Sequence, residues 1–237
     1  MAIFSFTQIK GGNGTTTLSA NLAELWPNPD RILMEMGVGG GNLGWTMGYD
    51  LAAPSAPTSL TEDGYDLVPE DGPPRRLSEI DKKNWQLPVL PAPMIPDFPP
   101  PGEKMWWQKR AELATQTEMD VICDLGVCVP EHLTIHNRVL NASISVIAVA
   151  ASSEEAKVAV KRLAKYRDSL AVVIISKYKS TPAEITGLVG CPCFAVLPRN
   201  DAIAESAWRN VLASDKSKQG REYLTAVSAL AHRLRGE

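Results

Sequence analysis

A glycine-rich segment near the amino terminus has the residue types and order of a loop that binds phosphate. It reads Lys10-Gly11-Gly12-Asn13-Gly14-Thr15-Thr16-Thr17 and lies between an apolar run at residues 2–7 and an amphipathic pattern at residues 16–25. Glycines let consecutive backbone N–H groups turn toward one anion, and the start of the following helix adds partial positive charge. The segment therefore predicts binding of a polyphosphate in a strand–loop–helix context. The alternative is a glycine-rich turn that only caps a helix.

The cysteines and histidines are the other residue types that could do chemistry. Cys123, Cys128, Cys191 and Cys193 could supply four thiolates to a zinc ion, but their spacings fit zinc knuckles poorly, and we expect small, buried apolar side chains instead. His132 and His136 lie four residues apart, and we expect a polar helix face rather than a metal pair. Neither set predicts a nucleophile with its base.

The elements that would position the glycine-rich segment alternate between apolar runs and amphipathic patterns. Seven runs predict strands, at residues 2–7, 31–36, 87–90, 120–124, 144–149, 170–176 and 193–197. Further helical patterns cover residues 103–117, 153–167, 203–213 and 221–235. Near-continuous apolar strands that alternate with helices predict an α/β fold with a mostly parallel, doubly wound sheet and helices on both faces.

One region interrupts this alternation. Residues 50–105 contain 12 of the 18 prolines, and proline neither donates to a strand ladder nor continues a helix. We expect a proline-rich surface excursion within a single domain that spans residues 1–237. Long loops of this kind often serve as lids or partner surfaces.

Composition and charge narrow the class of protein. The chain has 237 residues, 44% of them hydrophobic and 22% charged, with a net charge of −3. It lacks a signal-peptide pattern and any apolar run of the roughly 20 residues that span a bilayer, so we expect a cytoplasmic protein with reduced thiols. Residues 1–130 hold 17 acidic and 9 basic side chains, and residues 131–237 hold 10 and 15. The basic half could contact nucleic acid.

The glycine-rich segment resembles the loop of the deviant Walker A ATPases of the ParA/MinD superfamily, which are P-loop proteins of the SIMIBI class. Their loop runs Lys-Gly-Gly-x-Gly-Lys-Ser/Thr-Thr. The resemblance extends to a second strand that ends in an acidic residue, a later strand that ends in Asp124, and the turn Val196-Leu197-Pro198-Arg199-Asn200-Asp201. It implies a Rossmann-like, three-layer P-loop fold.

The resemblance also implies ligands and site residues. ATP would occupy the loop from Lys10 to Thr17, with Gly11, Gly12, Asn13, Gly14 and Thr15 around its phosphates. Lys10 matches the signature lysine that reaches across an ATP-sandwiched dimer. Thr16 matches the hydroxyl that ligates Mg²⁺, and Asp124 matches the aspartate that holds this ion through water. Lys177 and Asn200 lie where relatives frame the adenine.

Two departures from the family pattern concern hydrolysis. Thr15 stands in place of the ordinary P-loop lysine, which removes a cation that neutralises the phosphates. If Glu35 aligns with the first acid of the family's Asp-x-Asp, Gly37 takes the place of the second, the residue that positions the attacking water. Because phosphoryl transfer depends on positioning and charge stabilisation, we expect hydrolysis to be very slow or absent.

These features predict a protein that holds ATP with a degenerate hydrolysis site and acts as a dimeric scaffold for positioning or assembly, in a partition, pilus or secretion system. The threonine at position 15 also occurs in the CpaE/TadZ and BcsQ branches of the superfamily. One alternative is an active DNA-binding partition ATPase in which Glu35 or another acid orients the water. Another is a nucleotide-free pseudo-ATPase that only binds a protein partner.

The expected partners follow from the same resemblance. They are a second copy or a related ATPase, a protein of the larger machine, and nucleic acid on basic surface such as Lys157, Lys161, Arg162, Lys165 and Arg167. The apolar stripe of Leu224, Val227, Leu230 and Leu234 predicts a last helix that packs on the core, and we do not expect stable membrane insertion.

Overall fold

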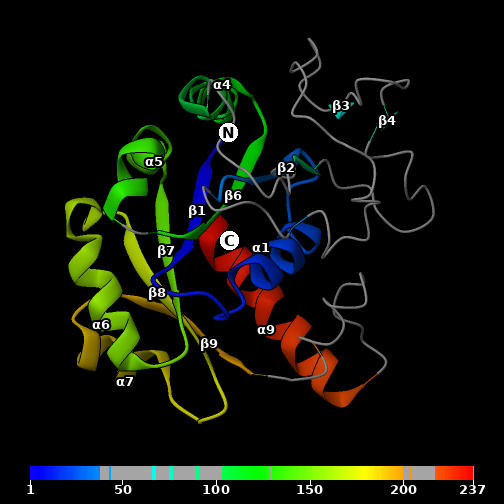
Figure 1. The fold of residues 1–237 in the computed structure, drawn as a ribbon. Coiled ribbons are helices and arrows are strands. Elements are labelled where there is room, and N and C mark those ends of the chain that lie inside the picture. The colour runs from blue at the N-terminus through cyan, green and yellow to red at the C-terminus, as the bar shows by residue number, and fades with distance from the viewer. Residues whose placement is uncertain are drawn as a thin grey trace.

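A parallel sheet of seven strands forms the centre of the computed structural model (Figure 1). Its order is β5 (Val89–Leu90), β2 (Arg31–Glu35), β6 (Asp120–Val127), β1 (Ile3–Gln8), β7 (Ser145–Ala150), β8 (Leu170–Ser176) and β9 (Cys193–Pro198). Strand β1 pairs with β6 on one side and with β7 on the other. Strand β2 lies beyond β6, whereas β8 and β9 lie beyond β7, so the strand order changes direction at β1. Ligands of open α/β sheets bind at such a switch point, beyond the carboxyl ends of the strands.

The structure describes residues 1–37, 43, 103–128, 130–199, 203 and 217–236, together with the two-residue strands β3 (Asp66–Leu67), β4 (Arg75–Arg76) and β5. For 103–109, 130–135 and these three strands, the description covers the backbone alone. Strands β3 and β4 pair in antiparallel fashion, apart from the main sheet.

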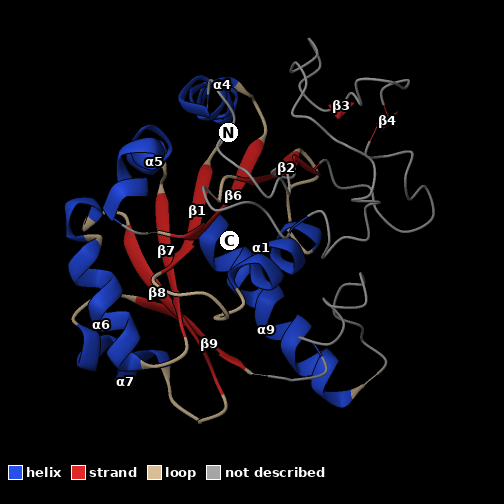
Figure 2. Cartoon of the chain, in the orientation of Figure 1, coloured by secondary structure: helices blue, strands red, loops and turns tan. Residues whose placement is uncertain are grey.

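Helices cover both faces of the sheet, which confirms the predicted three-layer α/β fold (Figure 2). One face carries α4 (Glu103–Gln116), α5 (Pro130–Ala142), α6 (Ser153–Arg162) and α7 (Pro182–Val189). The other face carries α1 (Thr15–Glu24) and α9 (Lys218–Arg235). None of the described helices is long and apolar enough to cross a bilayer.

Alternation along the strands produces the two cores. In β1, Ile3 packs into the core under α4 to α7, whereas Phe4 and Phe6 pack into the core under α1 and α9. The predicted stripe on the last helix is confirmed, because Val227, Leu230 and Leu234 are buried in that second core and Leu224 is partly buried against it.

The helices differ from the sequence expectation more than the strands do. The helix expected over residues 153–167 ends at Arg162, and a 3-10 turn follows at Ala164–Tyr166. Helix α7 was not predicted, although Thr181 and Glu184 form a capping box around Pro182, which is a recognisable start signal. The helix expected over 203–213 and most of the proline-rich region 50–105 lie outside the described residues.

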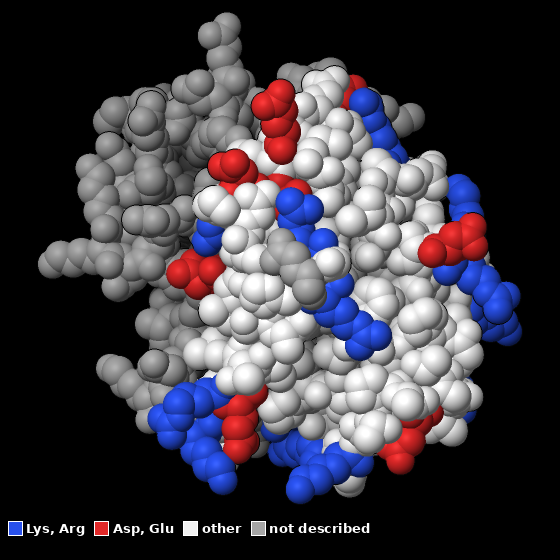
Figure 3. Space-filling view, turned by 180° about the vertical axis from the view of Figure 1, so that it is seen from behind, with Lys and Arg blue, Asp and Glu red and all other residues white. Residues whose placement is uncertain are grey.

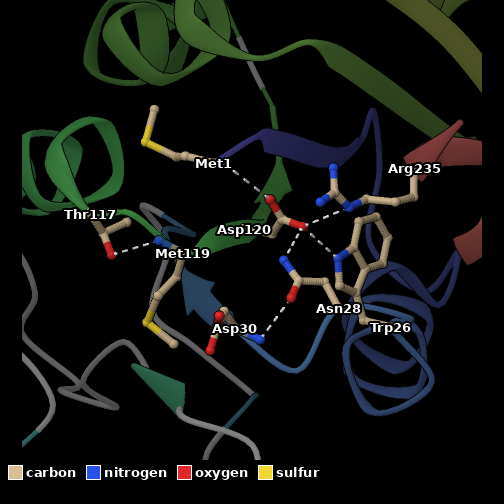
Figure 4. A network of polar contacts seen from close by, with 8 residues as sticks. All are labelled: Met1, Trp26, Asn28, Asp30, Thr117, Met119, Asp120 and Arg235. Carbon is tan, nitrogen blue, oxygen red and sulfur yellow. Dashed lines mark hydrogen bonds and ion pairs between the residues drawn. The ribbon is translucent and has the colours of Figure 1, made fainter.

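A buried carboxylate ties the two ends of the chain together at the edge of the sheet opposite the glycine-rich loop (Figure 4). Asp120, at the start of β6, is fully buried, and its Oδ2 accepts hydrogen bonds from Trp26 Nε1 at 3.1 Å and Asn28 Nδ2 at 3.0 Å. Arg235 Nε, in the last turn of α9, lies 3.1 Å from the same oxygen, and the amino group of Met1 lies 3.9 Å from Oδ1. This network joins the first residue, the linker after α1 and the final helix.

Candidate functional site

The glycine-rich loop, here Lys10–Gly14, connects β1 to α1 at the carboxyl edge of the sheet. Gly12 and Gly14 have φ angles of 84° and 82°, a region that side chains with a Cβ rarely adopt. Gly14 is the N-cap residue of α1 and has no side chain to accept from the first N–H groups, and no such acceptor is found among the described residues. The arrangement leaves backbone donors at the start of α1 that could bind an anion.

Thr15, which occupies the position of the ordinary P-loop lysine, turns into the protein. Its side chain is fully buried, and its hydroxyl donates a 2.9 Å hydrogen bond to Gln8 Oε1. The backbone N–H of Asn13 donates to the same oxygen at 3.2 Å. The Gln8 side chain, at the end of β1, therefore holds the loop by two hydrogen bonds. Sequence analysis missed it, although a polar residue at the end of an otherwise apolar strand was a usable signal.

Lys10, at the start of the glycine-rich loop, contacts a carboxylate of its own chain. Lys10 Nζ forms an ion pair with Glu155 Oε1 of α6, although the lysine side chain is 63% exposed. Glu155 Oε2 also accepts from Asn13 Nδ2 at 3.1 Å and from the Ala151 N–H at 3.0 Å. Burial alone would raise the pKa of Glu155, but Lys10, Ala151 and Asn13 outweigh it, so the pKa lies below its usual range. Glu155 thus connects the glycine-rich loop to the end of β7.

The Lys10–Glu155 ion pair predicts a specific pH dependence. A lowered carboxyl pKa contributes stability that is fully present above the unfolded value of about 4.3 and is lost as pH falls through the folded pKa. Glu155→Gln should therefore cost about 0.5–1 kcal/mol of unfolding free energy between pH 5 and 7, and this cost should shrink below about pH 4. Denaturant unfolding at several pH values measures it. Glu154→Gln, at the adjacent exposed position, is the control, and a pH-independent cost at position 155 would contradict the assignment.

Asp124 lies beside the start of α1 and is 1% exposed. Its Oδ1 accepts a hydrogen bond from the Gly126 N–H at 2.9 Å. Its Oδ2 is buried and accepts no hydrogen bond with good distance and angle from a described residue. Burial raises the pKa of this carboxyl, and the nearby Thr16 and Ser19 hydroxyls and the Gly126 N–H only partly oppose the rise. A buried carboxylate oxygen left open beside a threonine hydroxyl fits a hard cation such as Mg²⁺.

Glu35 lies on the neighbouring strand, in register with Asp124 and only 3% exposed. Its Oε1 accepts from the backbone N–H of Leu43 at 2.9 Å. Arg110 of α4, also buried, donates from Nη1 to the backbone oxygen of Glu35. Burial lowers the pKa of Arg110 to about 10, a shift that the charge of the nearby Glu35 carboxylate partly opposes. The Glu35 carboxylate is therefore buried, hydrogen-bonded to the backbone of Leu43 and close to the buried guanidinium of Arg110.

Met36, directly after β2, makes two further backbone hydrogen bonds. Met36 N–H donates to the Asp124 carbonyl at 2.7 Å, and His136 Nε2 of α5 donates to the Met36 carbonyl at 2.7 Å. The expectation that His136 contributes to a polar helix face is wrong, because its side chain is fully buried and serves this backbone group. The backbone of Gly37 packs so closely that a Cβ on Gly126 would lie 3.4 Å from its Cα.

A hollow of about 520 Å³, which includes open solvent, runs from the glycine-rich loop along the strand ends. Gly12 to Gly14 and Thr17 line its loop end, and Ile175, Pro198 and Arg199 continue the wall across β8 and β9. Tyr223 of α9, which sequence analysis treated as part of the last helix, also lines the hollow. Lys177 is exposed after β8 and is not among the described residues of the wall, and Asn200 lies outside the described residues.

All four cysteines are reduced and buried, as expected of small apolar side chains. Burial raises the pKa of the Cys123 thiol to about 12 and that of Cys193 to about 11, so both are protonated at neutral pH. Among the described residues, no three His, Cys, Asp or Glu side chains gather as a metal-binding group.

No protein-family model matches the sequence, and neither does any curated protein. Solved structures do match the fold over nearly the whole chain. MinD in the MinC:MinD cell division complex of Aquifex aeolicus matches with a TM-score of 0.68 and 16% identity, over 100% of this chain and 97% of the other. A ParA family ATPase from Chlorobium tepidum matches at 0.65 and 18%, over 97% of each chain.

A third match is the septum site-determining protein MinD of Pyrococcus horikoshii, solved with Mg-ADP, at a TM-score of 0.64 and 16% identity, over 98% of this chain and 95% of the other. At identities of 16–18%, these matches show the fold alone. The described sheet, its flanking helices and the position of the glycine-rich loop thus show that this chain has the α/β fold of the MinD and ParA ATPases.

Proposed function

We propose that the chain is a ParA/MinD-like protein that binds ATP with Mg²⁺ on the glycine-rich loop, hydrolyses it very slowly or not at all, and serves as a dimeric scaffold for positioning or assembly. The observation that carries this proposal is Asp124. One oxygen of its buried carboxylate has no partner among the described residues, and it lies beside Thr16 at the start of α1, where Gly14 is the N-cap and no side chain caps the helix. A polar atom left open in a buried setting costs free energy that a ligand would recover.

The residues present fit the magnesium nucleotide in a simple division of roles. Thr16 and Asp124 would hold the ion, Asp124 through water, and the ion would neutralise the phosphate oxygens. The backbone of Gly11 to Gly14 would bind the phosphates. A fold relative, MinD of Pyrococcus horikoshii, was solved with Mg-ADP, which supports this choice of ligand.

Slow hydrolysis is proposed from three features of the same site. Thr15 hydrogen-bonds to Gln8 and contributes no cation. Gly37 carries no side chain that could position water. The Glu35 carboxylate is buried and accepts from Leu43, an arrangement suited to holding the chain rather than a water. These features support a protein that retains its nucleotide.

Nucleotide binding is tested by calorimetry and thermal unfolding with ATP and Mg²⁺. At 100 times the dissociation constant, ATP should stabilise the protein by about 2.7 kcal/mol. Thr16→Val should abolish most of this gain, whereas Thr225→Val, on the exposed side of α9, should retain it. Absence of binding at millimolar ATP would reject the proposal in favour of a nucleotide-free pseudo-ATPase.

The active DNA-binding partition ATPase remains the second candidate because of one observation: Glu35 lies in register with Asp124 at the carboxyl edge. Turnover comparable to that of partition ATPases, stimulated by DNA and abolished by Glu35→Gln, would favour it. Lys157, Lys161, Lys165 and Arg167 are exposed, but on the face shown in Figure 3 basic side chains form separate groups interleaved with acidic ones. Nonspecific DNA binding depends on such surface cations and weakens with salt.

The scaffold role predicts assembly that depends on nucleotide. Sedimentation with and without ATP, alone and with a candidate ATPase partner, distinguishes a homodimer from a heterodimer. Lys10 would have to leave Glu155 to reach a partner, so Glu155→Gln should favour the dimer if Lys10 acts across the interface. The specific system, whether partition, pilus or secretion, and a likeness to the CpaE/TadZ and BcsQ branches are part of this proposal.

A further inference from the structure

Tyr223 lines the hollow beside the glycine-rich loop and has no role in the proposed function. Tyr223 comes from α9, far along the chain from the loop, yet it lines the same hollow as Gly12 to Gly14. A ligand that extends from the loop into this hollow would therefore have Tyr223 among the side chains around it.

Tyr223 is buried but incompletely bonded. Its side chain is 3% exposed, and its hydroxyl makes no hydrogen bond to another described residue, but this oxygen is not one of their fully enclosed polar atoms without a partner. The hydroxyl therefore keeps some access to the hollow that the side chain lines. Burial raises the pKa of the phenol, and no neighbouring charge or hydrogen bond opposes this shift among the described residues, so the group is a neutral donor and acceptor at physiological pH. Buried tyrosine hydroxyls usually find a partner. Among the described residues the hydroxyl has no such partner, so it is available to a ligand in the hollow.

The rest of the wall indicates what kind of ligand reaches this hydroxyl. Ile175, Pro198 and Ile203 give the outer part of the hollow apolar sides, which suit a flat heterocycle better than a further phosphate. Arg199 is exposed at the rim. A heterocycle between apolar side chains still needs a polar group for its edge, and Tyr223 is positioned to supply one.

We propose that Tyr223 is a specificity-determining residue whose hydroxyl hydrogen-bonds the polar edge of a purine base while the phosphates of the same nucleotide occupy the glycine-rich loop. This inference rests on the proposed nucleotide binding and adds the recognition of the base. It assigns to the last helix a binding role beyond core packing.

The test separates base from phosphate. Calorimetry with Mg²⁺ measures the binding of ATP and of inorganic triphosphate, which lacks a base, to the full chain and to Tyr223→Phe. Loss of the hydroxyl should weaken ATP binding about 3- to 10-fold, the scale of one neutral hydrogen bond, and should leave triphosphate binding within about twofold. Tyr178→Phe, in which an 82% exposed tyrosine loses the same atom, should change neither affinity.

Thermal unfolding of the ligand-free protein adds a readout that distinguishes recognition from a structural role. Because the hydroxyl has no partner among the residues that the structure describes, Tyr223→Phe should leave the melting temperature unchanged or raise it. A lower melting temperature together with equal ATP affinity would show that Tyr223 only supports the fold, and would overturn the inference.

The outcomes also separate this inference from the proposed function. If wild type binds neither ATP nor triphosphate, both proposals fail together. If wild type binds both and Tyr223→Phe binds ATP equally well, only the role of Tyr223 fails. If Thr16→Val loses both ligands while Tyr223→Phe loses affinity for ATP alone, the inference stands.

Discussion

Asp120→Ala should lower the free energy of unfolding by about 3 kcal/mol or more. The substitution removes the acceptor shared by Trp26 Nε1 and Asn28 Nδ2 and the ion-pair partner of Arg235, in a setting where the carboxylate is fully buried. Breaking a buried charge pair from one side costs about 3–5 kcal/mol, and each buried donor left unpaired adds to the loss. Denaturant unfolding followed by circular dichroism measures the change.

The matched control for this substitution is Asp168→Ala, which removes an exposed carboxylate and should change stability by less than about 0.5 kcal/mol. A second variant, Arg235→Met, keeps the aliphatic stem of the side chain and removes one member of the network. It should cost less than Asp120→Ala, because Trp26 and Asn28 keep their acceptor. An equal, small loss for Asp120→Ala and Asp168→Ala would contradict the role of the network.

Asp124→Asn should change stability in opposite directions with and without ligand. Burial raises the pKa of Asp124, so ionisation of this carboxyl costs free energy in the folded protein. This loss of stability is complete once the pH is above the pKa of the folded state. The neutral amide should therefore stabilise the ligand-free protein at pH 7 by about 1 kcal/mol. The same change removes the charge that would hold Mg²⁺, so the stabilisation by ATP and Mg²⁺ should fall sharply. Paired thermal unfolding curves measure both effects.

The pH dependence provides the internal check on this prediction. Wild type without ligand should gain stability relative to Asp124→Asn as pH falls toward the raised pKa, because protonation removes the unfavourable charge. Asp168→Asn, which alters an exposed carboxylate, should show neither this dependence nor a loss of ligand stabilisation. Reduced stability of ligand-free Asp124→Asn at pH 7 would mean that the carboxylate stabilises the fold.

The strands could be predicted because their apolar runs are continuous and sharply bounded. Helix α7 was harder, since Gly187 and Leu188 lie on its exposed side and blur the amphipathic pattern. The glycine-rich loop was also predictable, because its glycines follow one another in sequence and their backbone conformation is local. The structure then placed Gly12 and Gly14 at positive φ.

The partners around the loop could not be predicted, because they meet only when the sheet forms. Asn13 and Glu155 lie 142 residues apart, His136 and Met36 lie 100 apart, and Arg110 and Glu35 lie 75 apart. Nothing in the local sequence of α5 distinguishes a buried histidine that binds a carbonyl from one on a polar helix face. The same holds for Tyr223, whose pattern indicates core packing and whose missing partner is visible only in three dimensions.

The attachment of the segment after β2 bears on what kind of signal the proposed nucleotide site would send. Arg110 binds the Glu35 carbonyl, Asp124 the Met36 N–H, and His136 the Met36 carbonyl, so this segment is anchored from the sheet and from two helices. A molecular timer needs a segment at this place that relaxes when the terminal phosphate departs. With Glu35 and Met36 anchored at the end of β2 and with the slow hydrolysis proposed above, the site would report occupancy, and so the local nucleotide supply, rather than the time elapsed since loading.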